Sequence, residues 1–570
     1  MFRKNESHLQ KDLWSGLNEL PGKLRERLEN SWAGTFYELV FVKIDESICE
    51  VLYSDKASRP NIAVNILVGL SFLKNGYGWS DEEMYDHYCY DIQVRYALGL
   101  RELGAGGFDL RTMYEFRARL SRHMQETGAD LVGQIFAQVT DEQVQQLGLK
   151  SSHLRTDSTQ ISSNIRELSR LQLLVEVVQR VYRGLSEADQ AKWASEFEPY
   201  LKGSSGQYLY RLKGAGASQT HLEAIGQLMA QLVEQLAPVY SQSDSYALLW
   251  RVFDEHFQVE AAQVHPKPGE AISPQSLQSP DDWEATFRSK GGEGHTGYVA
   301  NVTETCHPDN DFQVILHTQT QPNTTDDAQM LADEISSLVE RTTVEKMFSD
   351  GNYGSPEVDA LMSQHQIELH QSAIRGPQPR PAAFNLAACQ LEFAPDQPPQ
   401  LSAVTAPSGE RIVVQSGRKD DRFILRFQQD PLAEAYDPTA PPAPVTHYLS
   451  QHQIDVAVRR QRAALLHQAD TNPRAAVEAT VYAIKRPFGN DKLPVRGRFR
   501  VGLAIIGSAA MVNLRRMHRF RTDQRQKLAK AAKTQAQNAS DFSLPYFLTH
   551  CFGIFRPLFG FLRCSCSQRT

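Results

Sequence analysis

The sequence predicts an α/β fold in which a mixed β-sheet is flanked by helices and preceded by an all-helical region. Helical periodicity and capping motifs fill the first 145 residues, and short β-type segments alternate with helical segments further along. Apolar residues make up 41% of the 570 residues and charged residues 22%, as in folded globular proteins. At roughly 100–200 residues per domain, a chain of this length should contain several domains.

The N-terminal region, residues 1–145, is predicted to be helical. Residues 62–73 are almost continuously apolar, which predicts a buried helix. The Ser/Thr-x-x-Glu spacing of a capping box, which marks the start of a helix, occurs at positions 80–83 and 112–115.

The helix predicted from Thr112 carries a basic face that includes Arg117 and Arg119. Short helices, one of them with a basic face, suit a helical DNA-binding region, and we predict that role for residues 1–145. An ordinary amphipathic helix whose arginines face solvent fits the same pattern.

The β-type segments begin after this region. Residues 152–161 alternate and are rich in β-formers, which predicts a strand with Asp157 near its centre. Further strands are predicted over residues 297–306, 312–320, 344–350 and 367–370, the fourth of the five strands ending at Asp350. Helices are predicted over residues 325–341, from Ser355, and from about Ser450 onwards.

These elements predict five parts, two of which interrupt the sheet domain. The predicted parts are an all-helical DNA-binding region (1–145), a sheet domain in three segments (146–164, 290–376 and 446–533), a helical insertion after the first strand (165–289), a β/loop insertion before the last helices (377–445) and a C-terminal tail (534–570).

Without the two insertions, the order is strand, strand, strand, helix, strand, helix, strand, helix, which is the plan of a ribonuclease H-like fold. The first and fourth strands are neighbours in this plan, so Asp157 and Asp350 are expected to lie close together. Two adjacent carboxylates repel each other unless a cation lies between them. Oxygen ligands with few cysteines or histidines nearby favour Mg²⁺ or Mn²⁺ over zinc.

A third carboxylate is available on a predicted helix. Glu478 has Arg474 four residues before it and Lys485 seven residues after it, so the three side chains share one helical face. An acid that completes a two-metal site, between two cations that can contact phosphates, suits a polyanionic substrate.

The pattern Arg474-x3-Glu478-x6-Lys485 resembles the Arg-x3-Glu-x6-Lys part of the Tyr-x2-Arg-x3-Glu-x6-Lys signature of bacterial insertion-sequence DDE transposases. Residues 154–159 and 348–354 are similar to that family's first and second aspartate motifs, and residues 62–120 are similar to the helical region that precedes its catalytic domain. The resemblance covers about residues 60–520. The signature tyrosine falls on Thr471, so no role for that tyrosine is carried over.

The resemblance implies a DNA transposase that hydrolyses the transposon ends and then transfers the freed 3′ hydroxyl into target DNA. Asp157, Asp350 and Glu478 would be the catalytic residues and would hold two Mg²⁺ (or Mn²⁺) ions. The partners would be the terminal inverted repeats and the target DNA, with the protein acting as a homodimer. Contacts to DNA are expected from Arg474, Lys485, Arg498, Arg500, Arg515 and Arg516.

The charge distribution fits a DNA-binding protein, although the net charge of −7 taken alone does not. Residues 485–533 contain fourteen Lys or Arg and two Asp, a local charge of +12. Such a stretch favours phosphate binding, and a solvated helix face is the alternative.

Seven cysteines without zinc spacing, no apolar signal segment and no long apolar run predict an intracellular protein that does not bind membranes. The resemblance to bacterial transposases implies a cytoplasmic, nucleoid-associated location in a prokaryote. Two other functions stay open. They are a metal-dependent DNA endonuclease without strand transfer and a non-catalytic, transposase-derived DNA-binding protein.

Overall fold

The computed structural model describes residues 1–9, 19–54, 56, 60–102, 104–212, 217–261, 263–374, 384–394, 400–416, 422–428, 444–468, 472–489 and 492–541. The chain divides into two compact units, Met1–Arg516 and Met517–Thr570. Helices and a mixed sheet make up the first unit, so the predicted α/β class is confirmed.

The described residues that precede the first strand form helices. Helix α3 is the most deeply buried of them, because every one of its residues except Tyr77 is buried. The α-helices are α1 (Gly22–Glu29), α2 (Trp32–Leu39), α3 (Val64–Tyr77), α4 (Asp81–Tyr90), α5 (Ile92–Ala97), α6 (Leu110–Thr127) and α7 (Leu131–Leu147).

One of the two predicted capping boxes is present. The Ser80 hydroxyl accepts a hydrogen bond from the Glu83 amide at 3.1 Å, and the Glu83 carboxylate accepts one from the Ser80 amide at 2.7 Å, which starts α4. The box predicted at 112–115 is wrong. Helix α6 begins two residues earlier because the Asp109 carboxylate caps it, accepting from the Arg111 amide at 2.8 Å.

The central sheet has six strands in the order β4-β5-β1-β7-β8, with β6 paired to β5. Strand β5 runs antiparallel to β1, β4 and β6, whereas β7 runs parallel to both β1 and β8. The short strand β4, which the sequence did not predict, pairs with the first residues of β5. The strands are β1 (His153–Ile161), β4 (Thr286–Lys290), β5 (Glu293–Thr305), β6 (Ile315–Pro322), β7 (Lys346–Ser349) and β8 (Glu368–Gln371).

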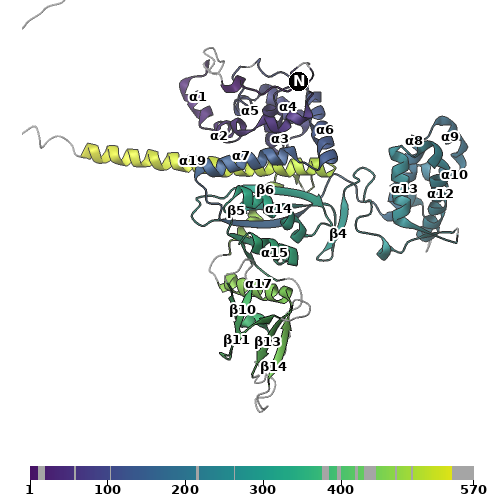
Figure 1. The fold of residues 1–570 in the computed structure, drawn as a ribbon. Helices are drawn as coiled ribbons and strands as arrows, with labels where there is room; N and C mark the ends of the chain where they lie inside the picture. Colours follow the sequence, from purple (N-terminus) through teal and green to yellow (C-terminus); the bar gives the residue numbers. More distant parts are fainter. Residues whose placement is uncertain are drawn as a thin grey trace, which may run out of the picture. The chain divides into compact units, whose positions relative to one another are not determined.

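Helices cover both faces of this sheet (Figure 1). On one face, α14 (Asp327–Arg341) and α15 (Pro356–Gln364) pack against apolar residues of β1, β7 and β8. On the other, α3, α18 (Ala475–Lys485) and the first part of α19 (Arg498–Asp541) pack against β5 and β6. Burial on both faces explains why β5 is buried without alternation from Tyr298 to Thr305.

Two groups of elements interrupt the sheet. Between β1 and β4 the chain forms helices with an apolar core of their own, followed by a hairpin: α8 (Arg170–Gly184), α9 (Glu187–Lys192), α10 (Ala194–Leu201), α11 (Ser205–Arg211), α12 (Ala217–Tyr240), α13 (Asp244–His256), β2 (Phe257–Glu260) and β3 (Gln263–Pro266).

After β8 come two small three-stranded sheets and one helix. Their elements are β9 (Gln390–Phe393), β10 (Leu401–Thr405), β11 (Arg411–Val413), β12 (Gln415–Ser416), β13 (Phe423–Phe427), β14 (Val445–Leu449) and α17 (Gln451–Gln468). Among the helices that the structure describes, none has both the length and the apolar composition that crossing a bilayer requires.

Candidate active site

Asp157 lies within β1, and Asp350 directly follows the neighbouring parallel strand β7. Leu154 of β1 pairs with Met347 of β7, and Arg155 pairs with Phe348. Continuing this register by two residues, one past the end of β7, brings Asp350 opposite Asp157, where adjacent strands are about 4.8 Å apart. Strand pairing thus joins two segments that lie far apart in the chain.

Asp350 is held at the end of β7 by a local turn. Its carboxylate caps the short 3-10 helix Gly351–Tyr353 and accepts a hydrogen bond from the Asn352 amide at 2.9 Å. The predicted turn after Asp350 is therefore present, and it fixes the carboxylate near the edge of the strand.

Burial and two neighbouring charges act on the Asp157 carboxyl. Burial raises the pKa of the Asp157 carboxyl, the Arg474 guanidinium lowers it, and the negative charge of Asp350 raises it further. The Asp157 side chain is only 12% exposed, so solvent screens these interactions weakly.

Arg474 joins Asp157 to the third predicted carboxylate. Its guanidinium lies 3.2 Å from the Asp157 carboxylate and 3.4 Å from the carboxylate of Glu478. The Glu478 side chain is 66% exposed, and it is linked to this site by its ion pair with Arg474. Within the described residues, no three His, Cys, Asp or Glu side chains approach closely enough to hold a metal ion in the arrangement seen here.

The donor set nevertheless fits a hard divalent cation. Asp157 and Asp350 offer carboxylate oxygens side by side, and a guanidinium supplies positive charge between Asp157 and Glu478. The Arg474 guanidinium therefore partly offsets the negative charge of the Asp157 and Glu478 carboxylates. Glu478, at the exposed edge in the first turn of α18, can change rotamer without disturbing the core.

Three of the predicted DNA-contacting residues lie along α18 and the start of α19. Lys485 is half-buried in the last turn of α18. Arg498 contacts Glu284 at 3.6 Å and donates to the Gln321 side chain at 3.1 Å, whereas Arg500 is exposed.

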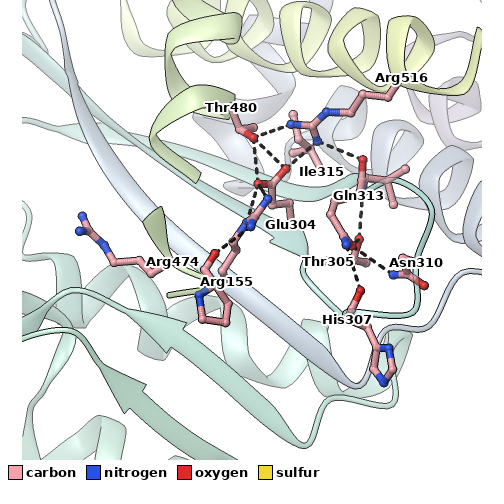
Figure 2. A network of polar contacts seen from close by, with 12 residues as sticks. Arg155, Glu304, Thr305, His307, Asn310, Gln313, Ile315, Arg474, Thr480 and Arg516 are labelled. Atoms are coloured by element: carbon pink, nitrogen blue, oxygen red, sulfur yellow. Dashed lines mark hydrogen bonds and ion pairs between the residues drawn. The ribbon is translucent and has the colours of Figure 1, made fainter. Parts of the chain in front are cut away.

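Two neighbouring arginines of α19 have different surroundings. Arg515 donates to the Gly76 carbonyl and its guanidinium lies 5.8 Å from the centre of the Tyr77 ring. Arg516 instead donates to Glu304, to Thr480 and to the Gln313 carbonyl, as Figure 2 shows. Arg516 therefore contacts other residues of this chain, which its place in a basic stretch of the sequence does not indicate.

The two N-terminal arginines also differ. Arg117 forms an ion pair of 2.6 Å with Asp81 and has a side chain only 14% exposed. Arg119 is exposed, with its guanidinium 5.4 Å from the centre of the Tyr53 ring.

Two buried carboxylates near the aspartates were missed by the sequence analysis. Asp327, at the start of α14, is 2% exposed and has one carboxylate oxygen without a hydrogen-bond partner, and burial raises its pKa, as does Asp350 more weakly. Glu334, about two turns further along the same face of α14, accepts hydrogen bonds from Thr303 at 2.8 Å and Asn301 at 3.2 Å. The available signal was the polar residues Asn301, Thr303 and Glu304 in the β5 segment, because polar side chains on a buried strand need hydrogen-bond partners.

The Glu334→Gln variant is expected to lose part of the pH dependence of stability. Burial raises the pKa of Glu334 to about 7 from its ordinary value of 4.5, while the Thr303 and Asn301 hydrogen bonds oppose the shift. The contribution of neutral Glu334 is therefore fully present below pH 4.5 and is lost as the pH rises to about 7. Up to about 3 kcal/mol of unfolding free energy is involved.

Urea unfolding of the wild type and the variant between pH 4 and pH 8 measures this effect. Gln keeps an oxygen that can accept from Thr303, and burial lowers the pKa of the adjacent His317 to about 4, so this histidine stays neutral above pH 5. The difference between the two proteins should widen in favour of Gln as the pH rises. Parallel curves over the whole range would show that Glu334 does not titrate in this window.

Comparison with protein families identifies one matching segment. Residues 25–119 match the family model described as Transposase domain (DUF772). The match runs from α1 into α6, includes Arg117 and Arg119, and ends before β1. No curated protein and no solved structure matches this chain. The matching segment supports a transposase family for the protein.

Proposed function

We propose that this protein is a DDE-type DNA transposase with a ribonuclease H-like catalytic domain. One observation carries the proposal: Asp157 and Asp350 stand side by side on adjacent parallel strands, and Arg474 connects Asp157 to Glu478 from a helix more than 300 residues later. The strand order β6-β5-β1-β7-β8, with only β5 antiparallel to its neighbours in that series, supports the ribonuclease H-like assignment. The match of residues 25–119 to a transposase domain supports the transposase part of the proposal.

Asp157, Asp350 and Glu478 would hold two Mg²⁺ or Mn²⁺ ions, because all three supply hard carboxylate oxygens. Bound there, the ions would supply the Lewis acidity that phosphodiester hydrolysis and strand transfer require. Arg474 would release Glu478 and turn its guanidinium to a DNA phosphate, which keeps the charge of the site balanced. Asp350 is already fixed for this role by its turn.

DNA is the proposed partner, in the form of transposon ends and target, bound by a homodimer. Arg119 and Arg500 are exposed and are therefore available to phosphates. Arg474, the N-cap residue of α18, and Lys485, its last residue, are proposed to contact DNA as well. The cytoplasmic, nucleoid-associated location follows from this partner. In the structure, Arg117, Arg498, Arg515 and Arg516 each contact other residues of the protein. We therefore propose that each of them contacts DNA only through guanidinium N–H groups that these protein contacts do not use.

A metal-dependent DNA endonuclease is the second candidate, because the same three carboxylates can cut DNA without joining it. A single assay separates the candidates. The protein is incubated with DNA that carries the sequences flanking its own gene, together with a supercoiled target plasmid, in Mg²⁺ and in EDTA. Joined products in Mg²⁺ would support the transposase, and nicked products without joining would support the endonuclease. A mobility shift without cutting in either buffer would indicate a DNA-binding protein without catalytic activity.

A further inference from the structure

Glu304 is a fully buried carboxylate with charged partners on both sides. Its side chain has no exposure to solvent, and both of its oxygens are engaged. Arg155 donates to one oxygen at 2.7 Å, Arg516 donates to the other at 2.6 Å, and the Thr480 hydroxyl lies 2.8 and 3.0 Å from the two oxygens. Figure 2 shows these contacts converging from β1, α18 and α19 on one strand residue.

Two of the three partners of Glu304 are close in sequence to residues of the candidate active site. Arg155 is two residues before Asp157 on β1, and Thr480 is two residues after Glu478 on α18. Arg155 also donates to the Pro473 carbonyl at 2.7 Å, which is the backbone unit immediately before Arg474. Glu304 and Arg155 together therefore fasten both the middle of α18 and the segment that leads into it.

Helix α18 has few other means of being placed. It has only eleven residues, its N-cap residue Arg474 makes no side-chain cap hydrogen bond, and only Val477, Thr480 and Ile484 are buried. The Ser508 hydroxyl donates to the Ile484 carbonyl at 2.6 Å, which holds the C-terminal turn of α18 but not the first turn, which carries Glu478. Two apolar side chains fix a helix position loosely, because apolar packing is non-directional. Hydrogen bonds to the buried Glu304 carboxylate are directional, so they fix both the position of α18 along its axis and its rotation about that axis.

We propose that Glu304 is a positioning residue of the active site, which through Arg155, Thr480 and Arg516 sets the position of Glu478 and Arg474 relative to Asp157. This inference rests on the proposed function for its catalytic consequence. The inference adds to the proposed function a role for Glu304, a strand residue outside the three carboxylates. That role is to hold Glu478 in the position that binding of metal and DNA requires.

The test compares Thr480→Val with Thr480→Ser, since valine has nearly the shape of threonine but no hydroxyl and serine restores the hydroxyl. In Thr480→Val, kcat for DNA-end cleavage should fall about 10-fold or more, with KM for DNA unchanged. The Mg²⁺ concentration that gives the half-maximal rate should rise by about 10- to 100-fold, the range known for the loss of residues that support metal ligands. Thr480→Ser should recover most of the rate. Glu304→Gln, assayed at low temperature, should lose more than Thr480→Val.

A measurement independent of activity is hydrogen exchange. Amides of residues 475–485 should exchange faster in Thr480→Val than in the wild type, while those of α8 stay unchanged. Glu255→Gln serves as the matched control, because Glu255 forms a 2.8 Å ion pair with Arg251 inside the helical insertion and has no contact with α18 among the interactions seen. It should leave the Mg²⁺ dependence and the exchange of α18 unchanged.

Equal kcat, equal Mg²⁺ dependence and equal exchange of α18 in Thr480→Val and the wild type would overturn the positioning role. A change in melting temperature without these changes would show that Glu304 acts on stability alone and would also overturn it. Failure of the proposed function is distinguishable, because the wild-type protein would then show no Mg²⁺-dependent cleavage while hydrogen exchange still reports on α18.

Discussion

Replacing Asp350 with asparagine is expected to reduce DNA cleavage and joining by at least about 100-fold, which is the loss typical of removing one group that stabilises transition-state charge. Asparagine has nearly the same size and can still accept from the Asn352 amide, so the turn after β7 is preserved. What is lost is the negative charge beside Asp157. Binding to DNA ends should be retained, since no phosphate contact is removed.

Gel assays of nicking and joining in Mg²⁺, with a mobility-shift assay in EDTA, measure the two effects separately. The control is Asp309→Asn, which removes the charge of an exposed aspartate paired with Lys150 and should leave both assays unchanged. Cleavage within a few-fold of the wild type would exclude Asp350 from the active site, and with it the proposed chemistry.

The Glu304→Gln variant is expected to have the largest effect on stability. Neutralising Glu304 leaves Arg155, whose side chain is 9% exposed, and the partly buried Arg516 without a counter-charge. Breaking a buried ion pair by removing one partner costs about 3–5 kcal/mol, because the remaining charge stays desolvated. We expect a loss of this size in the free energy of unfolding.

Urea unfolding followed by circular dichroism measures this loss. A matched control is Glu392→Gln, which breaks the exposed ion pair of Glu392 with Arg411 and should have little effect because solvent screens that pair. If Glu304→Gln were as stable as that control, the buried charges would have found other partners. The assignment of Glu304 as the charge that balances both arginines would then be wrong.

Local pattern was sufficient to predict the elements that carry the aspartates. The alternation around Asp157 predicted β1 nearly residue for residue, and the strand predicted over residues 344–350 is present as β7, two residues shorter at its start and one at its end. Both succeed because side-chain alternation and turn chemistry act over fewer than ten residues. The start of α6 was predicted wrongly because two residues that can cap a helix, Asp109 and Thr112, lie within four positions of each other. The helix begins after Asp109, whose carboxylate accepts a hydrogen bond from the Arg111 amide.

The arginines of the candidate site could not be assigned in this way. The sequence placed Arg474 and Arg516 in one class, as cations for DNA phosphates. In the structure, Arg474 lies between Asp157 and Glu478, whereas Arg516 is committed to Glu304, 212 residues away in the chain. No local pattern distinguishes these two environments.

The sequence by itself therefore determined the α/β class and the strands and helix in or beside which the three carboxylates lie. The tertiary structure alone decided that Glu304 is the buried centre of a charge network, that Asp327 and Glu334 lie near the aspartates, and that Arg474 joins Asp157 to Glu478. The reason is physical: backbone preferences depend on neighbours in sequence, whereas the partner and ionisation of a charged side chain depend on burial and on groups brought close by folding.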